Sequence, residues 1–238
     1  MKSIFCFFIA SLFVFPGYCQ KAEEYFNNGN AKFELHDYLG AISDYNKAIE
    51  LNPKLTGPFF NRGSAKDNLH DYMGAISDYN KAIELNSEYA DAYFNRGSVK
   101  VELQDFKGAI ADFNRTIKLN PEQPLAYFNR GVVKGNLQAF REAIADFDRA
   151  IELSSYYEDA YIIRGFMKGK LQDITGSMAD FEKAIELNPE NGLAYYERGL
   201  IKIDSGQKDS GCLDLNKAAE LGFLKAYDSI KKLCHLTL

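Results

Sequence analysis

The sequence predicts an all-α fold: a right-handed helical solenoid of six antiparallel helix pairs, closed by a capping helix at the C-terminal end. Two observations support this prediction. The triplet Asn-Arg-Gly begins at Asn61, Asn95 and Asn129, so the chain repeats itself every 34 residues. Helix-forming residues are abundant, and every proline after residue 50 lies at or beside a boundary between helical stretches. A repeat of this length, built from helices, is typical of proteins in which each repeat packs on its neighbours.

The period extends through six units, each marked by the same four columns of residues. The glycine column is Gly29, Gly63, Gly97, Gly131, Gly165 and Gly199. Four residues before each glycine stands an aromatic residue: Tyr25, Phe59, Tyr93, Tyr127, Tyr161 and Tyr195. Twelve residues after it stands a small residue, and four further on a large one: Ala41 and Tyr45, Ala75 and Tyr79, Ala109 and Phe113, Ala143 and Phe147, Ser177 and Phe181, Gly211 and Leu215. A spacing of four places both members of a pair on one helical face, so each unit should be two amphipathic helices.

The units commonly close with Asn-Pro, as at Pro53, Pro121 and Pro189. This pattern resembles the tetratricopeptide repeat family, whose units carry an early aromatic residue, a glycine, a paired alanine and aromatic residue, and a final proline. The resemblance covers residues 20–225, with repeats at 22–55, 56–89, 90–123, 124–157, 158–191 and 192–225. It implies a solenoid that binds other proteins. The stretch from Lys217 to Leu233 also resembles a Sel1-type repeat, and residues 226–238 are expected to form the capping helix and tail.

The N-terminus has the profile of a secretory signal peptide. Lys2 precedes an apolar run of 12 residues from Ile4 to Phe15, which Pro16 ends before it is long enough to span a membrane. We expect cleavage near Cys19 or Gln20, so that residues 1–19 are removed from an exported, bacterial-type protein of the periplasm or extracellular space. No stable membrane span should remain after cleavage. The alternative is an uncleaved segment that anchors the chain to a membrane.

Cleavage would leave two cysteines, Cys212 and Cys234. In an exported chain two cysteines favour a disulfide. An antiparallel hairpin around Gly222 would bring them together and clamp the end of the solenoid. The alternative is a pair of small, buried thiols.

Composition and motifs argue against several functions. With 28 basic and 33 acidic residues the net charge is -5, which gives no basic surface for nucleic acid. We find no motif of a nucleophile, a zinc site or a phosphate-binding loop, and the three histidines are too few to indicate a metal site. His36 and His70 occupy equivalent turns, where the repeat itself explains them. We therefore expect no enzyme activity, no cofactor, no metal and no small-molecule substrate.

Two columns on the first helix of each unit are candidates for binding a protein or peptide partner. The asparagine column is Asn27, Asn61, Asn95 and Asn129, and the phenylalanine column is Phe26, Phe60, Phe94 and Phe128. A row of carboxamides can bond to the backbone of an extended peptide of any sequence, while aromatic contacts add affinity. The asparagines could instead serve only to bond a neighbouring helix. The fold could also act as a structural scaffold or a self-associating assembly module of the cell envelope.

Charged columns complete the pattern. Basic residues recur on the first helix as Arg62, Arg96, Arg130, Arg164 and Arg198, followed four residues later by Lys66, Lys100, Lys134, Lys168 and Lys202. The second helix carries Asp44, Asp78, Asp112, Asp146, Asp180 and Asp214. Like charges four apart repel on a helix, so we interpret the aspartates as their structural ion-pair partners. The alternative is a charged stripe that binds a partner.

Overall fold

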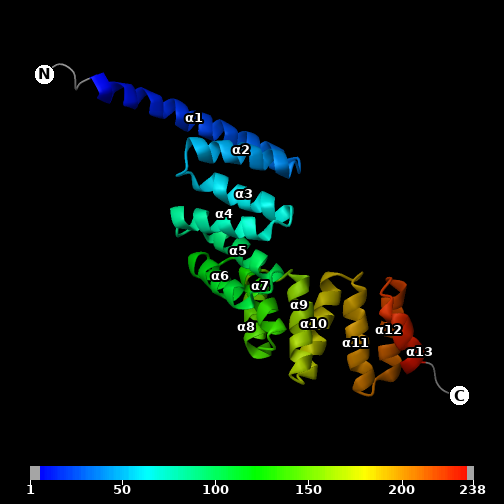
Figure 1. The fold of residues 1–238 in the computed structure, drawn as a ribbon. Coiled ribbons are helices and arrows are strands. Elements are labelled where there is room, and N and C mark those ends of the chain that lie inside the picture. Colours follow the sequence, from blue (N-terminus) through cyan, green and yellow to red (C-terminus); the bar gives the residue numbers. More distant parts are fainter. Residues whose placement is uncertain (1–5, 235–238) are drawn as a thin grey trace. The chain divides into compact units, whose positions relative to one another are not determined.

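The computed structural model describes the backbone of residues 6–234 and the side chains of residues 20–234. All regular secondary structure in this part of the chain is helical (Figure 1). The helices are α1 (Cys6–Glu34), α2 (Tyr38–Leu51), α3 (Thr56–Asn68), α4 (Tyr72–Leu85), α5 (Ala90–Glu102), α6 (Phe106–Leu119), α7 (Pro124–Asn136), α8 (Phe140–Leu153), α9 (Glu158–Lys170), α10 (Ile174–Leu187), α11 (Gly192–Asp204), α12 (Lys208–Glu220) and α13 (Lys225–Leu233).

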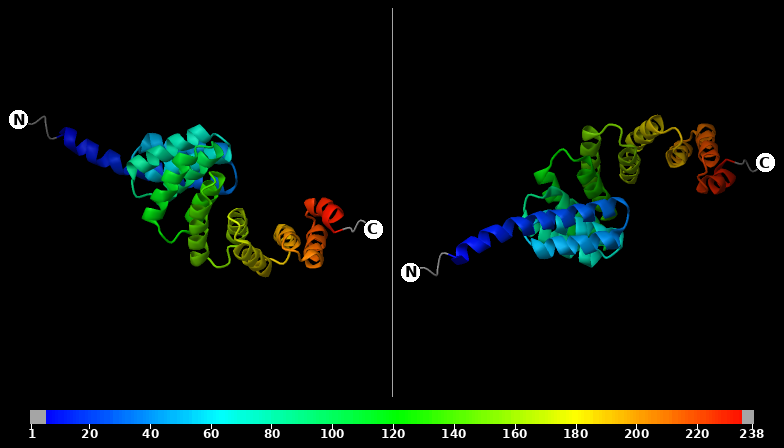
Figure 2. Two further views of the ribbon diagram at one scale, coloured as in Figure 1. Left: turned by 90° about the horizontal axis from the view of Figure 1, so that it is seen from below. Right: turned by 90° about the horizontal axis from the view of Figure 1, so that it is seen from above.

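The chain divides into two compact units, Met1–Pro121 and Glu122–Leu238, which we describe separately. In the first unit α1 packs on α2, α3 on α4 and α5 on α6, and each pair also packs on the next (Figures 1 and 2). In the second unit α7 packs on α8, α9 on α10 and α11 on α12, with α13 lying against α12. The expected all-α solenoid of stacked helix pairs is confirmed.

A repeated turn ends the first helix of a pair and starts the second. The second-last residue before the second helix has a positive φ, in the left-handed region that L-residues rarely adopt; these residues are His36, His70, Gln104, Gln138 and Gln172. An aspartate follows each of them except Gln138, which Ala139 follows. The aspartate then caps the second helix, as where the Oδ1 atom of Asp37 accepts a hydrogen bond of 3.0 Å from the Gly40 nitrogen. Equivalent caps form at Asp71, Asp105 and Asp173. The turn explains His36 and His70 without a metal.

The core of each pair is a large side chain packed on a glycine, and in five of the six pairs it is an aromatic ring. Tyr79 is fully buried, and a Cβ atom added at Gly63 would lie 2.9 Å from its Cε1 atom. Helices can approach this closely only where one side chain is absent, which is why the glycine column and the second-helix aromatic column occur together. The other large residues of that column are equally enclosed: Tyr45, Phe113, Phe147, Phe181 and Leu215.

Helices begin at the first residues of five predicted repeats, namely Thr56, Ala90, Pro124, Glu158 and Gly192. The first repeat differs, because α1 starts at Cys6 and extends beyond α2 (Figure 1). Residues 1–5 of the predicted signal peptide lie outside the described residues, as do the side chains of residues 6–19. Among the described residues, no helix combines the length and apolar character that crossing a membrane requires.

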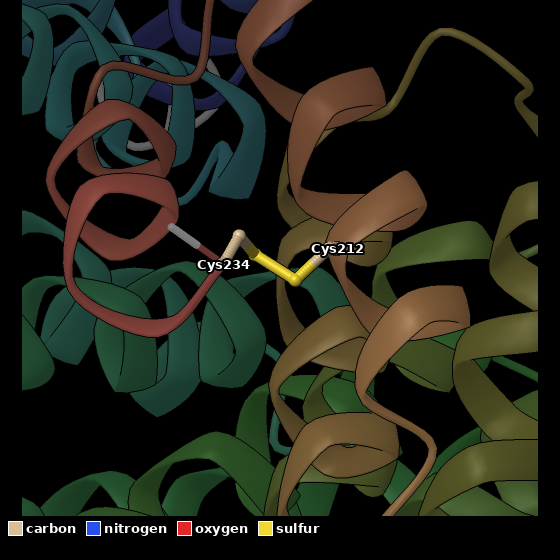
Figure 3. Close-up of a disulfide and its surroundings, with 2 residues drawn as sticks. All are labelled: Cys212 and Cys234. Atoms are coloured by element: carbon tan, nitrogen blue, oxygen red, sulfur yellow. A yellow bond between two sulfur atoms is a disulfide. The ribbon is translucent and has the colours of Figure 1, made fainter. Parts of the chain in front are cut away.

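The last helix, α13, packs on α12 through small residues. Ala226 is buried against Ala218 and Ala219, beside Phe223 and Ile230. A disulfide joins Cys212 on α12 to Cys234 at the end of α13, with their Cα atoms 5.6 Å apart (Figure 3). The covalent bond and the alanine contacts together fasten α13 to the final helix pair. His235 and the rest of the tail lie outside the described residues.

Candidate functional site

The asparagine column of the first unit lies on helices that touch one another. Helix α3 contacts both α1 and α5, and each of these first helices carries one asparagine of the column. Asn27 is exposed, whereas Asn61 and Asn95 are half-buried. The three amides therefore occupy one layer, formed by α1, α3 and α5, in successive repeats.

Two of these asparagines donate a hydrogen bond to the preceding repeat. The Nδ2 atom of Asn61 donates to Oδ1 of Asn30 at 2.7 Å, and that of Asn95 donates to Oγ of Ser64 at 3.4 Å. The same two acceptors also accept a hydrogen bond from a buried tyrosine hydroxyl. Tyr45 donates to Asn30 at 3.0 Å, and Tyr79 donates to Ser64 at 3.2 Å. Asn61 and Asn95 thus have a structural role.

Burial raises the pKa of Tyr45 and of Tyr79 to about 12. Hydrogen bonding with Asn61 opposes the shift at Tyr45, and hydrogen bonding with Ser64 opposes it at Tyr79. Both hydroxyls therefore stay protonated near neutral pH and act as donors. The side-chain oxygens of Asn30 and Ser64 therefore each accept two hydrogen bonds, one from a tyrosine of the same repeat and one from an asparagine of the next repeat.

A hollow of about 340 Å³ opens on this layer. Its polar lining comes from Asn30, Asn61, Ser64 and Asn95, together with the carboxylate of Glu34 and the hydroxyl of Tyr45. Asn30 and Ser64 were not among the binding residues predicted from the sequence. They stand three residues after the asparagine column, at a spacing that places them on the same helical face, and this spacing was the signal that could have identified them.

The phenylalanine column packs mainly inside the repeats. Each ring is half-buried against the second-helix aromatic residue of its own repeat, with ring centroids 5.7 to 6.0 Å apart. Phe60 also lies 4.8 Å from the ring of Tyr89, and Phe128 lies 4.7 Å from that of Tyr157, each just before the next repeat begins. These rings hold consecutive repeats together, and only part of each faces outward.

In the second unit the asparagine column has one member. Asn129 lies half-buried on α7, beside Phe128. The equivalent positions on α9 and α11 are Ile163 and Glu197, so the polar row does not continue through this unit.

The charged columns form ion pairs, as predicted. Each aspartate is buried, and all but Asp44 pair with two basic residues of the first helix, whereas Asp44 pairs with Lys32 alone on that helix. The pairs are Lys32 with Asp44, Arg62 and Lys66 with Asp78, Arg96 and Lys100 with Asp112, Arg130 and Lys134 with Asp146, Arg164 and Lys168 with Asp180, and Arg198 and Lys202 with Asp214. The negative charge of the aspartate lies between the two cations and offsets their mutual repulsion.

The described side chains include no cluster of three or more His, Cys, Asp or Glu residues arranged to hold a metal ion. The Nδ1 atom of His36 lies 3.0 Å from the hydroxyl of Tyr38, and His70 makes the same contact with Tyr72. Each histidine is thus engaged with its own turn.

Comparisons with known proteins agree with this architecture. Tetratricopeptide repeat models match residues 22–55, 125–157 and 158–191, and a model described as TPR repeat matches residues 70–103 and 97–138. No curated protein matches the sequence significantly.

Solved structures share the fold. YrrB, described as a TPR protein with an unusual peptide-binding site, is 24% identical with a TM-score of 0.69, over 79% of this chain and 97% of its own. PilF from Pseudomonas aeruginosa is 15% identical with a TM-score of 0.76, over 91% and 99%. A tetratricopeptide repeat protein from Parabacteroides merdae is 24% identical with a TM-score of 0.60, over 89% and 82%. With family models matching most of residues 22–191, this chain belongs to the tetratricopeptide repeat family.

Proposed function

We propose that this protein is a non-catalytic adaptor that binds an extended segment of a partner protein along α1, α3 and α5. The tetratricopeptide repeat fold indicates a protein interaction scaffold. The observation that carries the finer proposal is the hollow on the first unit, with its row of amides and hydroxyls from successive repeats. YrrB, a protein of the same fold, is described as having a peptide-binding site, which is consistent with this use of the scaffold.

The chemistry of the row suits a peptide backbone. A carboxamide has two donor hydrogens and an acceptor oxygen, so one bond to a neighbouring repeat does not exhaust Asn61 or Asn95. Packed helices lie about 8 to 10 Å apart, and an extended chain advances about 3.3 Å per residue. Successive asparagines would therefore meet every third residue of a bound segment. Each bond contributes only about 0.5 to 1.5 kcal/mol, so several repeats must act together.

We also propose that the protein is exported. The N-terminal sequence has the basic start and short apolar run of a secretory signal, and a disulfide between Cys212 and Cys234 suits an oxidising compartment. Mass spectrometry of the protein recovered from its host should find a chain that begins near Gln20. An intact N-terminus would contradict cleavage.

Photocrosslinking in the host can test the binding proposal. In the test variant a photoreactive phenylalanine analogue replaces Asn27, which is exposed on α1 and makes no hydrogen bond among the described residues. In the control variant it replaces Glu50, which is exposed on α2. We expect a crosslinked partner from position 27 and none from position 50. Asn27→Ala should then weaken binding of that partner severalfold without changing helicity. Equal crosslinking at both positions would reject this site.

Self-association is the second candidate function. Leu39 and Met73, at equivalent positions where α2 and α4 begin, are 71% and 70% exposed. The observation that favours this candidate is the recurrence of an exposed apolar residue at the same position of successive repeats. Light scattering after size exclusion should report a monomer if the adaptor proposal holds. A stable oligomer that Leu39→Lys and Met73→Lys dissociate, while Asn27→Ala does not, would favour the scaffold.

A further inference from the structure

The first helices change their chemistry between the two units. Three residues after the asparagine column stand Asn30, Ser64 and Ser98 in the first unit, but Val132, Phe166 and Leu200 in the second. After Asn129, the first residue of the column in the second unit, the column itself changes to Ile163 and Glu197. A polar surface that suits peptide backbone is therefore replaced by an apolar surface that carries one carboxylate.

A hollow of about 620 Å³ lies on this apolar surface, between α9, α10 and α11. Phe166 of α9 and Phe181 of α10 meet edge to face, with ring centroids 5.4 Å apart, and both line the hollow. Leu200 and Ile201 of α11 line it from the other side. These four side chains give the hollow an apolar surface large enough to receive a bulky side chain.

A glycine leaves part of this space open. Gly169 lies one turn after Gly165 on α9, and a Cβ atom added there would meet only the Oγ atom of Ser177, at 3.5 Å. That is an ordinary van der Waals distance, whereas the ring of Phe181 crowds the position of Gly165. Close helix packing thus does not require a glycine at position 169. Its effect is to keep the hollow free of a side chain.

Glu197 supplies the charge. It is half-buried at the edge of the hollow and forms no hydrogen bond or ion pair within residues 20–234. Burial raises the pKa of its carboxyl, while the positive charges of Lys225 and Lys170 oppose this shift. The buried aspartates of the fold each bind a cation directly, so Glu197 differs from them in being unpaired. Asp204 also lines the hollow, so the lining itself carries two carboxylates and one cation, Lys170, while Lys225 acts on Glu197 from outside the lining.

We propose that this hollow is a second binding site, which takes a partner segment with a large apolar side chain next to a lysine or arginine whose cation pairs with Glu197. Charge complementarity selects this occupant: the residues that line the hollow carry two carboxylates and one cation, and the half-buried Glu197 forms no ion pair within residues 20–234. Lysine and arginine also carry apolar stems, which can lie along Leu200 and Ile201 while the cation reaches the carboxylate. The inference shares with the proposed function only that the partner is a polypeptide.

Peptide selection on the full chain tests this assignment. A displayed library of random peptides is selected in parallel on the wild type, on Glu197→Gln, on Gly169→Leu and on the control Glu190→Gln, which alters an exposed carboxylate of the same unit. Circular dichroism first establishes equal helicity. We expect the wild type and the control to enrich peptides that place a basic residue beside leucine or phenylalanine, and both site variants to lose that class.

A synthetic peptide of the enriched class should bind Glu197→Gln about tenfold more weakly than the wild type, with less dependence on salt. Enriched peptides without a basic residue, or an affinity that Glu197→Gln leaves unchanged, would overturn the inference, as would a selection that yields no Glu197-dependent peptide. Asn27→Ala run in parallel separates the two proposals. Peptides that depend on Asn27 but not on Glu197 support the first site and reject the second, and the reverse result rejects only the first.

Discussion

Arg164 donates two hydrogen bonds to Asp180, from Nε to Oδ2 at 2.9 Å and from Nη2 to Oδ1 at 2.5 Å. Its remaining nitrogen donates to Oδ1 of Asp148 on α8 at 2.6 Å, and the guanidinium lies over the ring of Tyr161. One side chain of α9 is thereby bonded both to α10 and to the preceding repeat. Arg62 and Arg96 make the same connections through Asn46 and Asn80. Because a repeat contacts only its neighbours, such links fix how successive pairs stack.

Replacing Asp180 by asparagine should destabilise the second unit strongly. The aspartate is buried and pairs with Arg164 and with Lys168, whose Nζ atom lies 2.9 Å from Oδ2. Loss of its charge leaves Lys168 without an anion and Arg164 with Asp148 alone, in a mostly buried setting, which typically costs about 3 kcal/mol. Denaturant unfolding followed by circular dichroism measures the change. Glu190→Gln, an exposed control, should differ from the wild type by less than about 0.5 kcal/mol. An equally small effect of Asp180→Asn would refute a structural role for the pair.

Acid should weaken the last repeat through Asp214. Burial opposes its ionisation, but hydrogen bonds from Arg198 and Lys202 outweigh burial and hold the pKa of the carboxyl below its ordinary value. A depressed pKa in the folded state means that the stabilisation is present above the unfolded pKa, near ~3.9, and is lost as the pH falls through the folded value. Thermal melts from about pH 6 down to about pH 2 should show this loss. Asp214→Asn should be less stable at neutral pH and should show a flatter acid dependence.

Alkaline pH should act on the first unit through Tyr79, whose pKa burial raises to about 12. The unfolded chain ionises this group near ~10, so the unfolded state gains stability first, and folding weakens as the pH rises from about 10 to about 12. Near-ultraviolet absorbance of tyrosinate and helicity should therefore change together in that window. Tyr79→Phe should make the alkaline loss shallower. A Tyr79 that titrates near ~10 while the helices stay intact would show that the hydroxyl is accessible to solvent.

The repeat columns explain why sequence alone predicted so much of the fold. The pairing of Gly63 with Tyr79, and of the basic columns with the aspartates, recurs at a fixed period, and recurrence exposes a contact that a single copy would hide. The partner of Asn61 was not predictable in the same way. Asn30 lies 31 residues earlier, and that spacing becomes a contact only once the repeats are stacked.

The phenylalanine column shows a second limit. Phe60 precedes Asn61 in sequence, so its side chain points about 100° away around the helix. That rotation turns the ring toward Tyr79 and Tyr89, in the junction between repeats. A residue next to a surface column is therefore often an interior one. The caps at Asp37 and its equivalents were not predicted, although an aspartate that accepts a hydrogen bond from the backbone nitrogen three residues later is a common helix start.

Two glycine substitutions should have opposite effects. At Gly63 a new methyl group would lie 2.9 Å from the buried ring of Tyr79, and neither helix can yield without disturbing the core. Overpacking of this kind costs about 1 to 3 kcal/mol, which exceeds the helix propensity that alanine adds. At Gly169 the added methyl group fits, so Gly169→Ala should stabilise by up to about 1 kcal/mol. Thermal melts of the two variants beside the wild type show whether each substitution raises or lowers stability. Stabilisation by Gly63→Ala would show that the ring can move.

Removing the disulfide should loosen the C-terminal end and leave the first unit unchanged. The bond spans 22 residues of sequence, and closing a loop of this size stabilises by about 3 kcal/mol in the chain-entropy model. A double variant, Cys212→Ser with Cys234→Ser, still has the contacts of Ala226 with Ala218 and Ala219, but α13 is then held by a small apolar interface alone. Hydrogen exchange should accelerate in α13 and the end of α12, and not in α3 to α6. Unchanged exchange in α13 would mean that packing suffices to hold this helix. Exchange accelerated equally in both units would mean that the repeats unfold as one cooperative body, in which a clamp at one end stabilises every repeat.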